Sequence, residues 1–148
     1  MQDKIVKVVE LHAPVARVWR ALTDHEEFGT WFRVALDGPF HVGEVTRGRM
    51  TYPGYEGMPW ESRTEHMEHE RRFSFFWPSE DRNGAIDDPD VPKMRVEFRL
   101  EPTADGTRLT ITESGFASIP DPRRLEVLRD NTAGWDEQAE NIAAYVRS

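Results

Sequence analysis

The sequence of 148 residues contains no cysteine. Disulfide bridges, thiolate catalysis and zinc sites with cysteine ligands are therefore excluded. Long apolar runs are missing too, because nowhere do about 20 apolar residues follow one another, as a bilayer-spanning helix requires. Residues 1–11 have neither a long apolar stretch nor a small-residue cleavage site, so no secretory signal is expected. A cytoplasmic location and the absence of a membrane partner follow as expectations.

Positive charge is also scarce. Lys and Arg number 19 against 27 Asp and Glu, which gives a formal net charge of -8. An acidic chain repels phosphate backbones, and the sequence has no basic cluster, so we expect no binding of nucleic acid. The same charge balance favours a monomer or a weak dimer. The charged fraction of 31% and the mean hydropathy of -0.68 indicate a heavily charged surface.

Large aromatic residues, by contrast, are plentiful. The chain has five Trp and eight Phe, and 38% of its residues are hydrophobic. This length suits one domain with one core. Bulky rings build a core or the wall of a cavity. The surplus of rings therefore predicts one apolar or aromatic small molecule bound per chain.

The N-terminal part alternates between strand and helix patterns. Residues 5–11 are rich in Ile and Val and predict a strand. Pro14 then suits the first turn of a helix, and apolar residues at helical spacing extend this helix to about residue 23. Asp24 caps a second short helical segment that ends near Phe32. Further strands are predicted at 33–37, 44–51, 60–70 and 72–77, with loops at 51–59 and 79–92.

The C-terminal part predicts a hairpin followed by one long helix. Apolar residues alternate with charged ones from Met94 to Leu100, a turn follows at 104–106, and a last strand runs to Glu113. Asp121 and Pro122 predict the start of a helix, with Asp121 as its N-cap. Apolar residues at helical spacing carry it to about residue 147. The segment 131–134 is the weak point at which this helix is expected to bend or restart.

This order of elements predicts a single α+β domain over residues 1–148. It consists of one strand, two short helices, about six strands and one long helix, with no repeat and no linker. Helices that follow an antiparallel sheet in this manner cover one of its faces.

Motifs for metal, phosphate or nucleophile chemistry are absent or incomplete. His66 and His69 alternate with acidic residues, but on a strand they point to opposite faces, so no metal site is expected. Residues 79–90 imitate a calcium loop, yet Ser79 and Asp90 occupy positions where strong ligands are needed. No serine sits in a Gly-x-Ser-x-Gly elbow, and no glycine-rich phosphate loop occurs. The sequence therefore indicates no cofactor.

Several short motifs follow one another along the chain in a recognisable order. They are Ala13-Pro14, Val18-Trp19-Arg20-Ala21-Leu22-Thr23-Asp24, Trp31-Phe32, Val42-Gly43, Arg71-Arg72-Phe73 with Trp77, Glu113-Ser114-Gly115-Phe116 and Ala133-Gly134-Trp135. As a set they cover nearly the whole chain. The set resembles the START-like (SRPBCC) superfamily, and within it the Activator of Hsp90 ATPase homologue 1-like group.

This resemblance implies a helix-grip fold, in which a curved sheet of about seven strands wraps around the C-terminal helix and leaves an elongated cavity. Relatives include lipid and hormone binders, aromatase/cyclases and co-chaperone domains. Three functions follow as hypotheses: binding of a small, partly apolar ligand, a cyclase- or hydrolase-type reaction, and a co-chaperone-like interaction. Eukaryotic co-chaperones of this group carry a further N-terminal domain that engages the chaperone. The sequence does not contain it, so a chaperone partner is the weaker expectation.

Strand alternation supplies candidate residues for the cavity. Side chains two residues apart on a strand point to the same face. If Met67 faces inward, Arg63 and Glu65 therefore face inward too. If Leu109 and Ile111 face inward, Glu113 also faces inward. Either Glu113 or Glu65 would be the general base of an enzyme. The alternative is that these charged groups lie in water at the rim and that the rings are core. The candidate ligand-binding residues are the aromatic Trp31, Phe32, Phe75, Trp77, Phe98 and Trp135 and the polar Arg63, Glu65 and Glu113.

Overall fold

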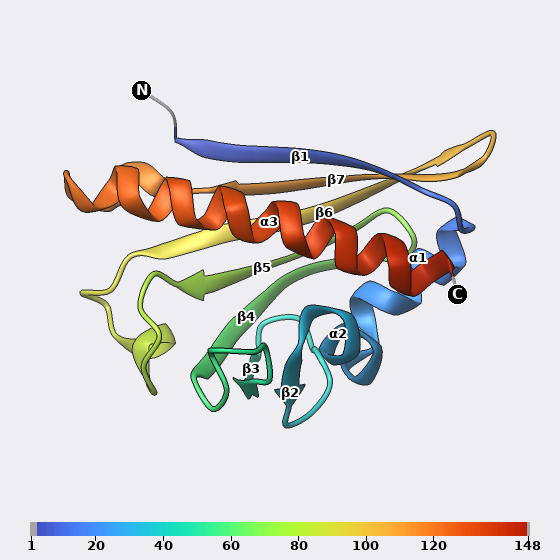
Figure 1. Cartoon of the computed structure of the whole chain (residues 1–148). Coiled ribbons are helices and arrows are strands. Elements are labelled where there is room, and N and C mark those ends of the chain that lie inside the picture. Colours follow the sequence, from blue (N-terminus) through green and yellow to red (C-terminus); the bar gives the residue numbers. More distant parts are fainter. Residues whose placement is uncertain (1–2, 148) are drawn as a thin grey trace.

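An antiparallel sheet of seven strands, in the order β1-β7-β6-β5-β4-β3-β2, forms the body of the protein (Figure 1). The computed structural model describes residues 3–147. The strands are β1 (Lys4–Leu11), β2 (Val34–Leu36), β3 (Val45–Met50), β4 (Pro59–Glu68), β5 (Arg72–Pro78), β6 (Lys93–Thr103) and β7 (Gly106–Ser114). The helices are α1 (Val15–Thr23), α2 (His25–Phe32) and α3 (Arg123–Arg147), with short 3-10 turns η1 (Ala85–Asp87) and η2 (Phe116–Ser118).

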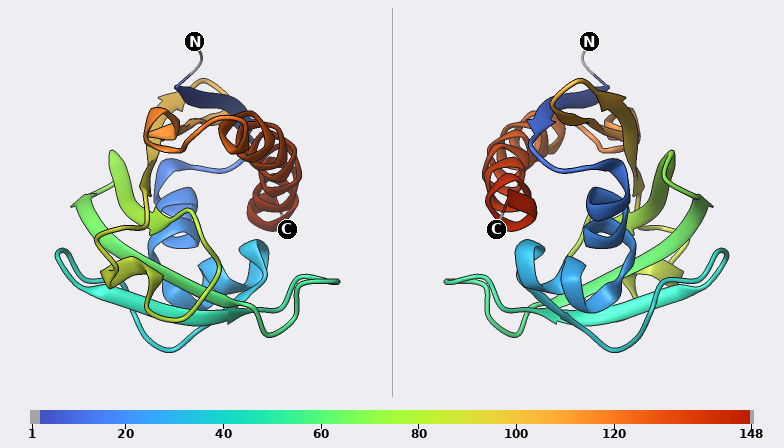
Figure 2. Two further views of the ribbon diagram at one scale, coloured as in Figure 1. Left: turned by 90° about the vertical axis from the view of Figure 1, so that its left-hand side faces the viewer. Right: turned by 90° about the vertical axis from the view of Figure 1, so that its right-hand side faces the viewer.

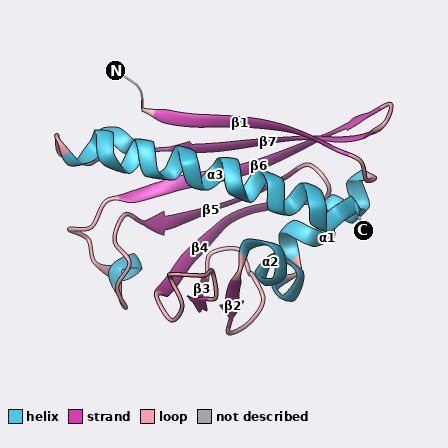
Figure 3. Cartoon of the chain, in the orientation of Figure 1, coloured by secondary structure: helices cyan, strands magenta, loops and turns pink. Residues whose placement is uncertain are grey.

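The sheet curls, and the three α-helices lie on its concave side (Figures 2 and 3). Helix α3 runs along the strands, whereas α1 and α2 close one end. The predicted α+β architecture, with two short helices after the first strand and a long C-terminal helix against a curved sheet, is confirmed. None of the helices within residues 3–147 has both the length and the apolar character needed to cross a membrane.

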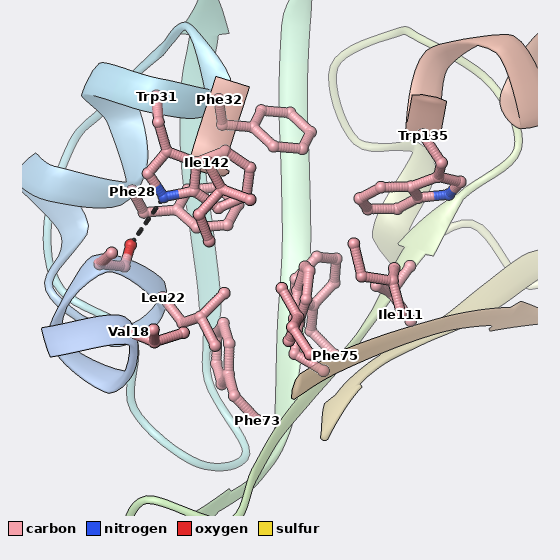
Figure 4. Close-up of a cluster of buried hydrophobic side chains, with 14 of the residues drawn as sticks. Val18, Leu22, Phe28, Trp31, Phe32, Phe73, Phe75, Ile111, Trp135 and Ile142 are labelled. Carbon is pink, nitrogen blue, oxygen red and sulfur yellow. Dashed lines mark hydrogen bonds between the residues drawn. The ribbon is translucent and has the colours of Figure 1, made fainter. Parts of the chain in front are cut away.

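Two sets of hydrogen bonds connect helices α1 and α2: the N-cap of α2 at Asp24 and a bond from the Trp31 indole to α1. The Asp24 carboxylate accepts hydrogen bonds from the backbone N–H groups of Glu26 and Glu27, at 3.0 and 3.1 Å, and so starts α2. The Trp31 indole N–H donates to the Ala21 carbonyl at 2.8 Å. Trp31 is therefore held between the two helices (Figure 4).

Helix α3 differs from its predicted form at two places. It begins at Arg123, because Asp121 and Pro122 form the turn that precedes it. Asp121 is therefore not the N-cap. The helix also runs without interruption through residues 131–134, where a bend was expected. The Asn131 side chain binds Glu113 across the interface, so it does not compete for the backbone of its own helix.

A bulge in β4 changes which residues face the interior. Up to Thr64 the even-numbered positions are the inward ones, but the pairing with β5 shifts between Thr64 and His66. Beyond the shift Met67, opposite Phe73, is the residue that packs on the core. The extra residue is Glu65, which the bulge leaves on the outer face.

The core is built mainly from rings. Side chains of α1, α2, α3 and the sheet meet around Phe28, Phe73 and Phe75, which are fully buried (Figure 4). From α3, Trp135 and Ile142 enter the same cluster. Much of the space between sheet and helix is thus filled, and the open space lies toward one end.

Candidate functional site

A cavity of about 670 Å³ opens beside residues 123–138 of α3, toward the N-terminal end of this helix. Its walls come from α3, the end of α2, the segment 50–60, and the end of β5 with residues 78–82. The larger apolar and aromatic side chains among its lining are Phe32, Met50, Tyr52, Tyr55, Met58, Trp60, Trp77, Met94, Val127 and Trp135. Polar side chains such as Asn131 and Gln138 interrupt this wall. Charged residues line the cavity as well, among them Glu61, Asp81, Arg82, Arg123, Asp130 and Glu137. The cavity therefore combines aromatic rings with a comparable share of polar and charged surface.

Four rings that line the cavity form one connected cluster. Trp77 stacks on Trp135, with ring centroids 5.7 Å apart and 23° between the planes. Phe32 contacts both of these rings, at 6.2 and 6.3 Å. Trp60 contacts Phe32 at 6.0 Å and Trp77 at 6.2 Å. Because each ring is held by others, the wall is a rigid aromatic surface rather than a set of independent side chains.

The Glu113 carboxylate lies behind this wall and fixes it. The Trp77 indole N–H donates to one carboxylate oxygen at 2.7 Å, and the Trp135 indole N–H donates to the other at 2.9 Å. The Asn131 amide donates to both oxygens, at 3.1 and 3.2 Å. One carboxylate from β7 thus sets the positions of a ring from β5, a ring from α3 and an amide from α3.

The charge of Glu113 has no described cationic partner. Its side chain is 0% exposed, and the hydrogen bonds described for it come from uncharged groups. Burial raises the pKa of the Glu113 carboxyl, and the N–H donors of Trp135, Trp77 and Asn131 pull the pKa only partly back. The alternative that the sequence left open for Glu113, a position in water at the rim, does not apply, because the carboxylate is fully covered.

This position bears on the enzyme hypothesis. A general base must come within hydrogen-bonding distance of the proton that it removes. The Glu113 carboxylate does not line the cavity; the residues that bind it do. The geometry assigns Glu113 the role of holding Trp77 and Trp135 in place, which is a positioning role.

Two hydrogen bonds connect the walls of the cavity, one exposed and one buried. The Tyr52 hydroxyl, on the segment after β3, hydrogen-bonds the Glu137 carboxylate on α3. The Gln138 amide donates to the Phe32 carbonyl at 2.9 Å. The sequence did not predict a role for Tyr52, because the Pro and Gly content of 51–59 indicates only a loop. The two tyrosines and the methionine in this short loop were the sequence feature that could have indicated a part of the cavity wall.

The predicted site residues fall into three groups. Phe32, Trp77 and Trp135 line the cavity. The others on the inside lie next to it without lining it: Trp31, Phe75, Phe98 and Glu113. Arg63 and Glu65 lie on the opposite, outer face of the sheet.

The predicted inward placement of Arg63 and Glu65 is therefore wrong. Arg63 forms an ion pair with Asp87 at 3.0 Å, and Glu65 binds Arg95 at 2.7 Å and the Ser74 hydroxyl at 2.8 Å. The prediction assumed unbroken alternation back from Met67, and the bulge at Glu65 breaks it. Neither side chain is available to anchor a ligand in the cavity.

Glu61 is a buried charge that the sequence did not indicate. Its carboxylate accepts from the backbone N–H groups of Gly84 and Ile86, at 3.1 and 3.2 Å, and from Arg47 at 2.9 Å. Burial alone would raise the pKa of Glu61, but the hydrogen bonds from Gly84, Arg47 and Ile86 outweigh it and hold the pKa below its usual value. Glu61 thereby fastens the loop 79–92 against the outer face of β4, and this loop supplies one side of the cavity mouth.

The acidic and histidine-containing segments make ordinary surface contacts. His66 lies 3.6 Å from Glu65, and His69 lies 3.3 Å from Glu70. Within residues 3–147 no group of three or more His, Asp and Glu side chains is arranged to hold a metal ion.

Comparison with solved structures shows the same fold elsewhere. A protein from Arthrobacter aurescens is 20% identical, with a TM-score of 0.80 over 97% of this chain and 86% of its own. MLL2253 from Mesorhizobium loti is 21% identical, with a TM-score of 0.77 over 97% of this chain and 96% of its own. DynU16, a protein in the dynemicin biosynthetic locus, is 26% identical, with a TM-score of 0.76; the match covers 100% of this chain and 48% of DynU16.

No curated protein matches the sequence. The family model described as Activator of Hsp90 ATPase homolog 1-like protein, however, matches residues 12–147. This span includes the cavity wall, the Glu113 cluster and the whole of α3. The chain belongs to the Activator of Hsp90 ATPase homologue 1-like family.

Proposed function

We propose that this protein binds a small, partly apolar molecule, aromatic or of similar flatness, in the cavity beside α3. The observation that carries the proposal is the connected cluster of Phe32, Trp60, Trp77 and Trp135 at the border of the cavity, in which Trp77 is half-buried and the other three rings expose only 3–7% of their surface. A volume of about 670 Å³ falls within the range usual for small-molecule pockets. Phe32, Trp77 and Trp135 would contact the ligand, whereas Phe75, Phe98 and Trp31 would support them from behind.

The location of Glu113 adds to this proposal. Burying the Glu113 carboxylate has an unfavourable desolvation free energy, which its hydrogen bonds to two indole N–H groups offset only in part. A protein that needed only a packed core could avoid this cost by using apolar residues at these positions. The arrangement preorganises a flat wall, and preorganisation lowers the cost of binding. The 26% identity to a protein in a biosynthetic locus agrees with a small-molecule ligand. The filled inner core is also compatible with a co-chaperone-like interaction domain. Such a domain, however, would not require the cavity.

The test is a panel of aromatic and acyl compounds measured by calorimetry and thermal shift, with a variant that fills the cavity. Gly134 lines the cavity, and a Cβ at this position would meet nothing within 4 Å. Gly134→Leu should therefore occupy the cavity without disturbing the packing, and we expect it to weaken binding about tenfold or more. The matched control is Ala144→Leu, at an exposed position of the same helix.

Two results would contradict the proposal. If no compound in the panel produces heat or a shift of the melting temperature, the cavity has no ligand of this class. If compounds bind equally well to wild type, Gly134→Leu and Ala144→Leu, binding takes place elsewhere.

A further inference from the structure

The contacts described for the Glu113 carboxylate are all hydrogen bonds that it accepts. The Trp77 and Trp135 indole N–H groups donate to one oxygen each, at 2.7 and 2.9 Å, and the Asn131 amide nitrogen lies 3.1 and 3.2 Å from the two oxygens. An ionised carboxylate accepts on both oxygens, whereas a protonated one has an O–H group to donate. The observed arrangement therefore fits the ionised form.

The surroundings of Glu113 favour the opposite form. Its side chain is 0% exposed, and burial disfavours a charge that has no ion-pair partner. The pKa of the Glu113 carboxyl is accordingly raised. Hydrogen-bond geometry thus requires the ionised carboxylate while burial favours the neutral acid, so the group changes its protonation state at a higher pH than an exposed glutamate does.

The charged side chains of the elements packed around Glu113 are bound to other groups. On β1, β5, β6 and α3 these contacts are Lys7 with Asp136, Arg72 and Arg95 with Glu97, Lys93 with the carbonyls of Asp88 and Val91, and Asp130 with Arg129. Within residues 3–147, none of these side chains is described as a partner of Glu113. Burial and the three N–H donors therefore set its protonation equilibrium.

Asn131 is the partner that can respond to a proton on Glu113. An indole ring has only its N–H donor, whereas an amide carries a donor and an acceptor. The O–H of the neutral acid finds an acceptor when the Asn131 amide turns over, so that Oδ1 takes the place of Nδ2. The bonds from the two indoles then lose their charge assistance, and neutral hydrogen bonds are roughly half as strong. Asn131, Trp77 and Trp135 all line the cavity.

We propose that Glu113 and Asn131 form a proton-dependent switch of the cavity wall. With Glu113 ionised, Trp77 and Trp135 are held in their stacked arrangement, with 23° between the ring planes. With Glu113 protonated, the Asn131 amide is turned, both rings are held less firmly, and the ligand binds more weakly. Ligand affinity therefore falls as the pH falls. This effect on affinity rests on the proposed function, whereas the change in the wall does not.

Nuclear magnetic resonance follows the switch without a ligand. Proton–nitrogen correlation spectra are recorded between about pH 4 and pH 9, because burial raises a carboxyl pKa by up to about 3–5 units. The indole N–H signals of Trp77 and Trp135 and the side-chain amide signals of Asn131 should move together, with one midpoint above about pH 4.3. The Trp31 indole, which donates to the Ala21 carbonyl, should stay in place. Single Trp→Phe variants assign the indole signals.

Two variants separate this proton from the others. Glu113→Gln has the shape of the neutral acid and does not ionise, so its Trp77 and Trp135 signals should remain near the low-pH positions of wild type. Glu140→Gln removes an exposed carboxyl on the helix that carries Asn131, and it should titrate as wild type does. The five His residues titrate in the same range, but none of them, all within residues 3–147, lines the cavity.

An uncharged fluorescent aromatic probe, N-phenyl-1-naphthylamine, tests the effect on affinity. Its Kd for wild type should rise at least about fivefold from the high-pH limit to the low-pH limit. In Glu113→Gln the Kd should be constant and close to the low-pH value of wild type. Circular dichroism confirms that each variant is folded, and the wild-type titration tests the switch independently of the variants.

The possible results are distinct. Trp77 and Trp135 signals that do not titrate, that still titrate in Glu113→Gln, or that move without the Asn131 amide would overturn the switch. A probe that binds wild type equally at every pH would overturn the effect on affinity. A probe that binds at no pH would count against the proposed function, and the ligand-free spectra would still decide whether the wall responds to the proton.

Discussion

At the level of single residues, the buried carboxyl of Glu113 should make the free energy of unfolding depend on pH in an unusual way. Because burial raises the pKa of this carboxyl in the folded protein, the folded state holds the proton more tightly than the unfolded state does. Its contribution to the free energy of unfolding is complete below the unfolded pKa of about 4.3 and is lost as the pH rises through the folded pKa. Glu113→Gln lacks this dependence. The unfolding free energy of wild type minus that of Glu113→Gln should therefore fall with rising pH.

Denaturant unfolding of both proteins at a series of pH values checks this prediction. The other carboxyls cancel in the difference, including Glu61, whose pKa is shifted in the opposite direction. A difference that is flat above about pH 4 would mean that the carboxyl of Glu113 has an ordinary pKa.

Trp135 joins the packing of α3 to the Glu113 cluster, and two substitutions separate these contributions. Trp135 is 3% exposed, and we expect Trp135→Ala to lower the free energy of unfolding by about 3–5 kcal/mol. Trp135→Phe keeps a ring but removes the N–H that binds the carboxylate, which should cost about 1–3 kcal/mol. Chemical denaturation measures both. Equal losses in the two variants would show that the hydrogen bond, rather than the ring, dominates.

At the level of elements, α3 contains a glycine that packing does not require. Gly134 precedes the buried Trp135, but an added Cβ at Gly134 would meet nothing within 4 Å. Gly134→Ala should therefore stabilise the protein by about 0.5–1 kcal/mol, because alanine favours a helix interior.

The matched comparison is Gly115→Ala. Gly115 has a φ of +103°, and an added Cβ would lie 3.2 Å from the Lys93 carbonyl oxygen. That variant should lose stability in the same thermal-unfolding experiment. Destabilisation by Gly134→Ala would indicate that the helix is strained at this point.

The loop 79–92 depends on one carboxylate. Glu61→Gln removes the charge that receives the Gly84 and Ile86 amides and the Arg47 guanidinium. We expect these two amides to exchange with solvent at least about tenfold faster in the variant, as measured by hydrogen exchange. Unchanged exchange at Gly84 and Ile86 would show that the remaining contacts of the loop suffice.

Regular alternation and helical spacing predicted most elements, and the failures have local causes. The strands from Met94 to Glu113 show unbroken alternation, and their prediction is confirmed. In β4 the pattern is interrupted by a bulge, which no residue type in the sequence marks, so the inward placement of Arg63 and Glu65 was wrong. The alternation did place Glu113 on the inner face, as observed.

At the level of the whole molecule, the cavity could be predicted only in part. Phe32, Trp77 and Trp135 line it as expected, because aromatic residues on inward positions must face the interior. Its other wall, with Tyr52 and Met58, comes from a loop whose path depends on contacts with α3 distant in sequence. Local patterns carry no information about such contacts.

The acidic surface gives a prediction for the molecule as a whole. With a net charge of -8, the protein should not bind duplex DNA tightly at physiological salt, because its excess of acidic groups repels the phosphate backbone. A fluorescence anisotropy titration with a labelled duplex checks this. Micromolar or tighter binding at about 150 mM salt would contradict it.

The pairing of β1 with β7 also affects how the protein is made. Lys4 pairs with Ser114, so β1 leaves the ribosome and waits for its partner while more than a hundred residues are added. At about 5–20 residues per second, this wait lasts roughly 5–20 seconds. Until then, the meander from β2 to β6 can assemble from neighbouring strands alone, whereas Val6 and Val8 remain uncovered on an unpaired segment. The N-terminal strand is thus the last strand to join the sheet, and the stage of synthesis before β7 emerges is the one at which this chain is most exposed to aggregation and to chaperones.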